Sequence, residues 1–198
     1  MTLRRFNNTL SVVVIVLGLY ISLSPFLPQI AYWLKDKSPE HSAPYAGALA
    51  DSVGSTSDSQ KPQDNRIVIP SIQVNEPVLE GGGIWVIHDG GTWRRPQTGN
   101  PKDGGNTVIV GHRFYGNNIS TFYHLDKVLP GQRLALYWEG TEYLYEVTES
   151  KVVEPTQIDI EAPTNEDRLT IYTCTPIWTA KQRLVIIAKP IPREGDNS

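Results

Sequence analysis

The sequence predicts a mainly β domain, folded as a barrel or a sandwich and preceded by one N-terminal transmembrane helix. From residue 66 onward, short runs rich in Val, Ile, Leu and Tyr alternate with turns that contain Gly, Pro or Asn, and no long amphipathic helix interrupts them. A length of 198 residues is enough for one such domain with an appendage. The net charge of -3 gives no electrostatic support for a nucleic-acid partner.

The N-terminus predicts a membrane anchor. Leu10 to Leu23 form an uncharged apolar run, and a weaker apolar stretch continues to Leu34. Together they approach the ~20 residues that a helix needs to cross a bilayer. Arg4 and Arg5 would also suit the start of a cleaved signal peptide, but no convincing cleavage site with small residues follows. We therefore expect a single-pass protein of the cell membrane, with a cytoplasmic tail at 1–9, the transmembrane anchor at 10–34, a flexible linker at 35–64 and an extracytoplasmic domain at 65–198.

The extracytoplasmic domain is built from short runs with strand character. In chain order these runs cover residues 66–70, 72–79, 107–110, 133–138, 142–148, 151–154, 169–174 and 184–188. Gly140 and Thr141 join two of them in a clear hairpin. Another short apolar run covers 84–87, between the turn at 81–83 and a loop at 89–105 with room for one helical turn. The other connections are a loop at 115–120, a short helix or turn at 122–128 and a polar segment at 155–168.

The only cysteine, Cys174, ends one of these strands. Alternation along the strand places Cys174 on the face opposite Thr173, and Pro176 stops the ladder soon afterwards. If the runs 169–174 and 184–188 pair as an antiparallel hairpin, Cys174 and Arg183 become neighbours at one rim of the sheet. Without such context, a lone cysteine is more often a small buried hydrophobe, and an exposed arginine more often makes a weak structural ion pair.

A histidine follows another strand in a similar way. His112 comes just after the run 107–110, and Gly111 before it permits a tight turn that presents the imidazole. Cysteine, histidine and arginine together suit acyl transfer, with a thiolate nucleophile, an imidazolium proton donor and a guanidinium that stabilises an oxyanion. His88 is the competing histidine, whereas His41 falls in the linker and His124 in a segment where packing is expected.

These residues resemble the sortases. The family pattern TLxTC is matched by TIYTC at 170–174, with Ile171 in place of leucine, and Arg183 opens the next strand. The segment VIVGHR at 108–113 matches the family's histidine motif, and the resemblance extends in order and spacing from Arg66 to Pro190. It implies a closed eight-stranded sortase-type β-barrel and a cysteine transpeptidase, which is also a cysteine-type endopeptidase. Such an enzyme cleaves an LPxTG-like C-terminal sorting motif through a thioester, and transfers the surface protein to an amine of a peptidoglycan precursor or a pilin.

The resemblance also implies a role for single residues. Cys174 corresponds to the nucleophile, His112 to the general acid and then base, and Arg183 to the oxyanion-stabilising or substrate-orienting group. The segment 155–168 corresponds to one wall of the motif groove, and 175–182 to the other. The candidates for substrate binding are Thr173, Thr175, Trp178 and His88, although loop packing for Trp178 and a structural role for His88 are the alternatives. No metal or cofactor is expected, since the spacing of the acidic residues matches no cation loop; a calcium site is the alternative, from Asp89, Asp103, Glu161, Glu166 and Asp167.

Two other functions stay open at this point. One is a different cysteine acyl-transfer enzyme or hydrolase of the cell envelope, which would act on cell-wall peptides and ignore an LPxTG peptide. The other is an inactive, surface-tethered β-barrel that serves as a binding module, whose cysteine would react slowly with thiol reagents and form no acyl-enzyme.

Overall fold

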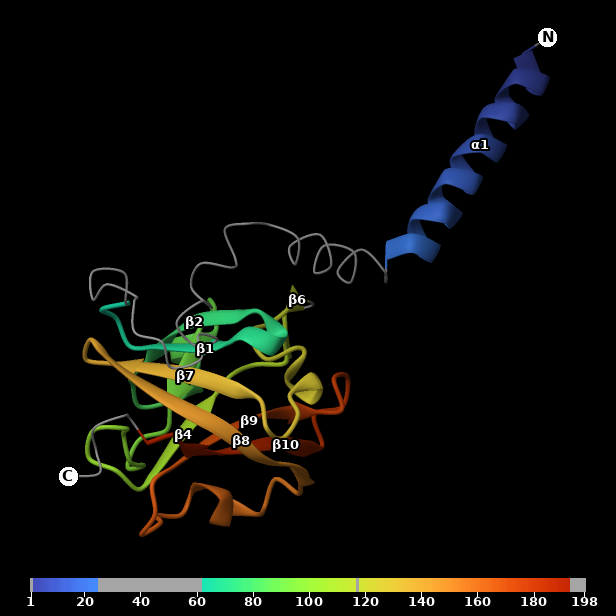
Figure 1. Ribbon diagram of the computed structural model, residues 1–198. Coiled ribbons are helices and arrows are strands. Elements are labelled where there is room, and N and C mark those ends of the chain that lie inside the picture. The colour runs from blue at the N-terminus through green and yellow to red at the C-terminus, as the bar shows by residue number, and fades with distance from the viewer. Residues whose placement is uncertain (1, 25–61, 117, 193–198) are drawn as a thin grey trace. The chain divides into compact units, whose positions relative to one another are not determined.

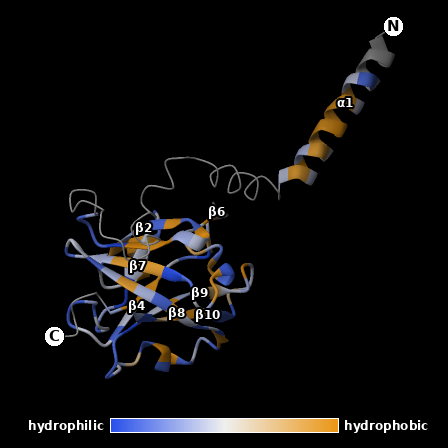
Figure 2. Cartoon of the chain, in the orientation of Figure 1, coloured by the Kyte–Doolittle hydropathy of each residue, from blue (hydrophilic) through white to orange (hydrophobic). Residues whose placement is uncertain are grey.

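The computed structural model describes residues 2–24, 62–116 and 118–192, and the chain divides into a unit at 1–41 and a unit at 42–198. In the first unit, helix α1 (Thr2–Leu23) carries exposed apolar side chains from Leu10 to Leu23, drawn mostly orange in Figure 2. No helix in the described ranges is both long and apolar enough to span a membrane. The helix begins earlier than expected, and residues 25–34 of the expected span lie outside the described residues, as does the linker up to residue 61. The anchor therefore stays a prediction.

The second unit is a closed barrel of eight strands in the order β1-β2-β3-β4-β9-β10-β8-β7 (Figure 1). This confirms the expected eight-stranded barrel. The barrel strands are β1 (Arg66–Ile69), β2 (Val74–Leu79), β3 (Thr92–Arg94), β4 (Asn106–Val110), β7 (Arg133–Trp138), β8 (Thr141–Val153), β9 (Arg168–Thr175) and β10 (Gln182–Pro190). Outside it, β5 (Phe114–Tyr115) and β6 (Asn118–Ile119) form a small hairpin, and the 3-10 helices are η4 (Pro70–Ile72), η5 (Ile84–Ile87), η6 (Leu125–Lys127) and η7 (Ile158–Glu161).

Inward-facing side chains that alternate along the longer strands fill the barrel interior. On β9, Leu169 and Ile171 are fully buried in the core together with Leu136 of β7 and Ile186 of β10. Each such side chain stabilises the fold by about 1.5–3 kcal/mol relative to leaving it exposed. Phe122, just before η6, is also fully buried and belongs to this core.

A second apolar group covers the outside of β4 and β9. We call it the outer cluster; it consists of Ile87, Trp93, Val108 and Val110, with Leu79, Val86 and Tyr172 packed against it. Because η5 contributes Ile87, this short helix lies over the outer face of the barrel next to the ends of β4 and β9.

Several expected elements differ in detail. The loop expected at 89–105 contains β3, whose Trp93 is buried and donates its indole N–H to the carbonyl of Gly81 at 2.9 Å. The loop expected at 115–120 contains the β5–β6 hairpin. The second strand starts at Val74 rather than at residue 72, because η4 and a left-handed Gln73 (φ 55°) precede it. Residues 141–153 form one continuous strand, β8, rather than two runs.

Candidate active site

The register between β4 and β9 brings His112 and Cys174 together. The two strands are parallel, with Val110 paired to Tyr172. The same separation of 62 residues continues beyond the ladder, where the Thr173 hydroxyl donates to the carbonyl of Gly111 at 2.8 Å. It holds once more where Arg113 Nη1 donates to Thr175 Oγ1 at 2.8 Å. His112 lies between these two contacts on one segment and Cys174 between them on the other, so the two residues are lateral neighbours.

Cys174, His112 and Arg183 share the outer face of the barrel. Arg183 is paired directly with Cys174 in the antiparallel ladder of β9 and β10, as expected. Tyr172 packs in the outer cluster, whereas Leu184 lies in the core. Because side chains alternate along a strand, Cys174 points outwards like Tyr172, and Arg183 points away from the core. Three half-buried functional groups from adjacent chain segments therefore meet at one end of the barrel.

The Arg183 guanidinium is held by backbone carbonyls. Its Nη1 donates to the carbonyl of Ala180 at 3.1 Å and to that of Gln182 at 3.0 Å. No carboxylate in the described part of the chain forms an ion pair with it. The positive charge is thus held beside Cys174 without being neutralised by a carboxylate.

His112 is held by packing more than by polar contacts. Its ring stacks on Tyr115 with centroids 4.6 Å apart, and Phe122 N donates to its carbonyl at 3.0 Å. Its Nε2 is buried and has no hydrogen-bond partner among the described residues. Burial lowers the pKa of His112 below its ordinary value, and charge on His88 lowers it further. The imidazole is therefore biased towards its neutral form.

Gly111 is required by the close approach of Phe122. A Cβ at position 111 would lie 2.6 Å from the Phe122 ring, a distance that real side chains do not show. The absence of a side chain lets the segment after β4 pass over this ring and turn His112 outwards.

Arg113 was not singled out by the sequence analysis, and it is the most buried charged group near the site. Only 8% of it is exposed. Its Nη2 forms an ion pair with Asp126 at 2.8 Å, and its Nε donates to the carbonyl of Tyr123 at 3.2 Å. Together with the bond to Thr175, these contacts fasten the residue after His112 to the residue after Cys174. The only sequence signal was its place beside His112.

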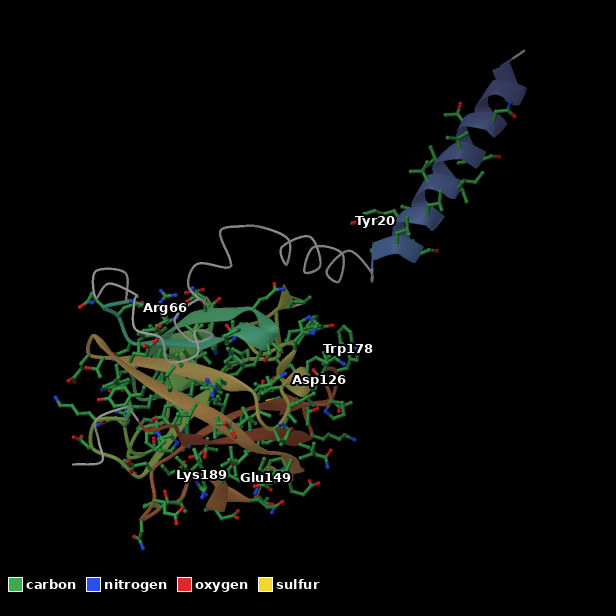
Figure 3. The ribbon with its side chains drawn as sticks, viewed as in Figure 1. Tyr20, Arg66, Asp126, Glu149, Trp178 and Lys189 are labelled. Atoms are coloured by element: carbon green, nitrogen blue, oxygen red, sulfur yellow. The ribbon has the colours of Figure 1, made fainter. Side chains whose placement is uncertain are left out.

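The four candidates for substrate binding have different environments. Thr173 is buried inside the barrel and Thr175 accepts a hydrogen bond from Arg113, so both hydroxyls hold the site together. Trp178 is 79% exposed, projects from the surface in Figure 3 and packs edge-on against Phe114 at 4.8 Å. His88 is exposed and lies 5.8 Å from His112 between ring centroids.

The segment 155–168 is fastened to the outside of the barrel through Glu161. Arg95 Nε donates to both oxygens of Glu161, at 3.0 and 2.9 Å, and the Tyr172 hydroxyl donates to the same carboxylate at 2.5 Å. Asn106 Nδ2 adds bonds to the carbonyls of Ile160 and Ala162 at 3.0 and 2.9 Å. We call these contacts the Glu161 clamp. Burial, reinforced by this carboxylate, raises the pKa of Tyr172, which keeps its hydroxyl a donor.

The acidic residues considered for calcium do not form one site, and several of them bind other side chains. Glu161 belongs to the clamp, Glu166 pairs with Lys189 at 3.2 Å, and Asp103 accepts from Asn100. Within the described ranges, no three His, Cys, Asp or Glu side chains gather in a way that could hold a metal ion.

Comparison with known proteins covers the same part of the chain. The family model of the sortase domain matches residues 67–191. Sortase A of Listeria monocytogenes is 28% identical over 123 residues, which are 62% of this chain and 54% of that protein. Sortase A of Bacillus anthracis is 25% identical over 134 residues, which are 68% of this chain and 62% of that protein. The chain thus spans little more than half the length of these relatives.

A solved structure shows the same architecture. Sortase A from Corynebacterium diphtheriae has a TM-score of 0.60 and 26% identity, over 69% of this chain and 64% of that one. The domain match begins in β1 and ends just after β10, so it takes in the whole barrel and all three groups at its end. The chain belongs to the sortase family.

Proposed function

We propose that the protein is a cysteine transpeptidase that cuts an LPxTG-like sorting motif near the C-terminus of a surface protein and joins the protein to an amine. The observation that carries this proposal is the common register that makes His112, Cys174 and Arg183 neighbours on one face. The amine acceptor belongs to a peptidoglycan precursor or to a pilin.

The first half-reaction forms a thioester. The Cys174 thiolate attacks the carbonyl carbon of the motif threonine, and the Arg183 guanidinium stabilises the oxyanion that develops. The tetrahedral intermediate collapses as the C–N bond breaks. His112, as imidazolium, gives its proton to the leaving glycine nitrogen.

The second half-reaction reverses these roles. The acceptor amine attacks the thioester carbonyl, and neutral His112 takes the proton that the amine loses. The C–S bond then breaks and returns the Cys174 thiolate. Water in place of the amine would give hydrolysis, the endopeptidase side of the same chemistry.

The lowered pKa of His112 has two opposed effects on this cycle. With ordinary pKa values of about 8.5 for cysteine and 6.5 for histidine, only about one per cent of molecules carry the thiolate and the imidazolium together near neutral pH. Burial of His112 reduces that population further. It also makes each imidazolium a stronger acid, which favours proton transfer to a poorly basic leaving amide nitrogen.

The surroundings of the site suit an extended peptide. The segment 155–168, held by the Glu161 clamp, forms one wall, and 175–182 forms the other, with Trp178 and Phe114 offering an aromatic surface to an apolar motif side chain. We assign these roles to Trp178 and to both segments. Thr173 and Thr175 act indirectly by holding the strand ends.

We also propose that residues 10–34 anchor the enzyme in the cell membrane with the barrel on the extracytoplasmic face. Support comes from the charge-free run from Leu10 to Leu23 and from the apolar stretch that continues to Leu34. Deleting residues 1–34 should release the enzyme from the membrane fraction.

The test is to trap an acyl-enzyme. The protein is incubated with a panel of sorting peptides, with and without amines, and the mass of the Cys174 peptide is measured. We expect an acyl adduct that amines discharge, its loss in Cys174→Ala, and a rate lowered by a few orders of magnitude in Arg183→Ala. Retained turnover in Cys174→Ala, or acylation by cell-wall peptides but by no sorting peptide, would overturn the proposal; the second result would indicate a different envelope enzyme.

A further inference from the structure

Three aromatic rings from separate segments meet at His112. We call His88, Tyr115 and His112 the ring cluster. Tyr115 stacks on His112 at 4.6 Å and 17°, and on His88 at 4.7 Å and 22°. The two imidazoles are themselves 5.8 Å apart, tilted by 36°. The phenol ring therefore contacts both imidazoles, which also lie within reach of each other's charge.

The three rings are held by different elements. His88 is the C-cap residue of η5, which is packed on the barrel through Ile87. Tyr115 belongs to β5. Phe114, the other residue of β5, packs against Trp178 of the segment after β9. The β5–β6 hairpin thus touches η5 with one side chain and the segment after β9 with the next, and it spans the surroundings of His112.

Among the described residues, the titratable and charged groups next to the His112 ring come from separate elements. They are His88 from η5, the Tyr115 hydroxyl from β5, Cys174 from β9 and, on the far side of Cys174, Arg183 from β10. The neighbouring Arg113 is directed to Thr175 and Asp126 instead. Within the described ranges, no carboxylate is among the groups that shift the pKa of His112, so no negative charge from them offsets the repulsion between two protonated imidazoles.

Resting on the function proposed above, we propose that Tyr115 and His88 are positioning residues for His112: Tyr115, stacked on both imidazoles, fixes the plane of the His112 ring and covers it from water, and His88 holds the stack from η5. Burial is the larger cause of the lowered pKa of His112, and the charge of His88 is the smaller one. Together, burial and His88 favour the neutral His112 ring in the resting enzyme. A proton that the ring then accepts is released readily, because the imidazolium is a stronger acid. His88 is thereby assigned to His112 rather than to the substrate.

The experiment is a titration of the histidines by NMR in the full-length protein, which needs no substrate. His88→Gln removes the second imidazole. His124→Gln is the matched control, because His124 contacts Tyr123 edge-on and its pKa is affected by burial and by the charges of Asp126, Lys127 and Arg113 rather than by His112. Tyr115→Ala removes the stacked ring, whereas Tyr115→Phe keeps it. Tyr115→Leu fills the space without a flat ring, in case Tyr115→Ala fails to fold.

We expect the His112 midpoint to move to higher pH in His88→Gln and in Tyr115→Ala, and to stay in place in His124→Gln and Tyr115→Phe. The limb of the transpeptidation pH profile that follows His112 should move in the same direction, with KM for the sorting peptide unchanged. An unmoved midpoint in both folded variants would overturn the inference. An unmoved KM together with an unmoved profile would contradict the assignment of His88, and a raised KM alone would return His88 to substrate binding.

The two proposals fail in distinguishable ways. If Cys174→Ala retains turnover, the proposed function fails while the His112 titration still reports on the ring cluster. If the midpoint does not respond to either variant, the inference fails while acylation of Cys174 is untouched.

Discussion

Arg113 influences the site without facing the reacting groups. The three nitrogens of its buried guanidinium bind the Thr175 hydroxyl, the Asp126 carboxylate and the Tyr123 carbonyl. A planar, permanently charged fork suits such a role, because it can fasten several segments at once. Arg113 follows His112 in the chain, and its partner Thr175 follows Cys174. The spacing between His112 and Cys174 therefore depends on a side chain that takes no part in the proposed chemistry.

We expect Arg113→Met to lower the free energy of unfolding by about 1–3 kcal/mol, since charged hydrogen bonds to Thr175 and Tyr123 are lost. The rate of acylation should fall as well, because the strand end that carries Cys174 loosens. Urea denaturation and single-turnover acylation measure the two effects. The control is Lys127→Met, which removes the exposed partner of the same Asp126 at 3.5 Å and should change stability by no more than about 0.5 kcal/mol. Equal effects of the two variants would refute this role of Arg113.

Gly111 gives a second prediction for a single residue. Gly111→Ala places a methyl group 2.6 Å from the Phe122 ring. It should lower the free energy of unfolding by about 1–3 kcal/mol, because the ring cannot move far in a packed core. Gly82→Ala is the matched control, since its nearest neighbour, Trp85, is 3.8 Å away. Thermal unfolding measures both. Adding Phe122→Leu should recover part of the loss from Gly111→Ala, and strict additivity of the two changes would show that the clash is not the cause.

At the scale of elements, the segment 155–168 is held by specific contacts rather than by a regular ladder. The Glu161 clamp joins η7 to Arg95 after β3 and to Tyr172 of β9, while Asn106 of β4 holds the neighbouring carbonyls. The Glu161 carboxylate thus accepts bonds from the residue that follows β3 and from β9, the strand that carries Cys174. These contacts would preorganise the proposed groove wall before a peptide binds.

Glu161→Gln should loosen this wall without unfolding the barrel. The ion pair with Arg95 is half-exposed, with side-chain exposures of 34% and 23%, so we expect a global loss of only about 1 kcal/mol. Hydrogen exchange of residues 155–167 should become faster, and KM for the sorting peptide should rise more than kcat falls. Tyr172→Phe removes one bond to the same carboxylate and should have a smaller effect. Unchanged exchange in Glu161→Gln would mean that the Asn106 bonds and the backbone contacts hold the segment without the Glu161 carboxylate.

The elements that sequence predicts well are those with a long local pattern. The β7–β8 hairpin and the strand that carries Cys174 have patterns of six or more residues, and the structure contains both, although β8 is longer than expected. β3 has only three residues and β5 and β6 two each, so their alternation is too short to detect. The position of β3 is set by its pairing with β2 and β4 and by the burial of Trp93, whereas β5 and β6 pair with each other.

The same limit applies to the residues around the site. Cys174, His112 and Arg183 could be selected because each stands next to a strand with a clear pattern. Two contacts could not be predicted in this way: that of Glu161 with Arg95, 66 residues away, and the stacking of Tyr115 of β5 on His88 at the end of η5. Contacts of that kind depend on how loops cross the barrel, which no local pattern encodes.

At the scale of the whole molecule, two partly buried histidines couple stability to pH. Burial lowers the pKa of both His112 and His124 below the ordinary 6.5. As the pH falls below 6.5, the unfolded chain takes up protons at these positions that the folded chain does not yet bind, so acid favours unfolding. The stability they contribute is complete above this range and is lost on the way down to their folded-state pKa values.

We therefore expect the melting temperature to fall between pH 7.5 and 5.5, and to fall less in a His112→Gln/His124→Gln variant. Carboxylates titrate mostly below this window, so the difference between the two proteins isolates the histidines. Differential scanning calorimetry at several pH values measures it. A variant that loses as much as the parent protein would show that other groups govern the acid response.

The place of β10 in the barrel has a consequence for synthesis. β10 lies between β8 and β9, although it is the last barrel strand to leave the ribosome (Figure 1). Until it inserts, the ring is open, and Arg183 has no partner position opposite Cys174. A nascent polypeptide therefore carries the Cys174 sulfur without the Arg183 guanidinium beside it until β10 has been synthesised and has inserted between β8 and β9.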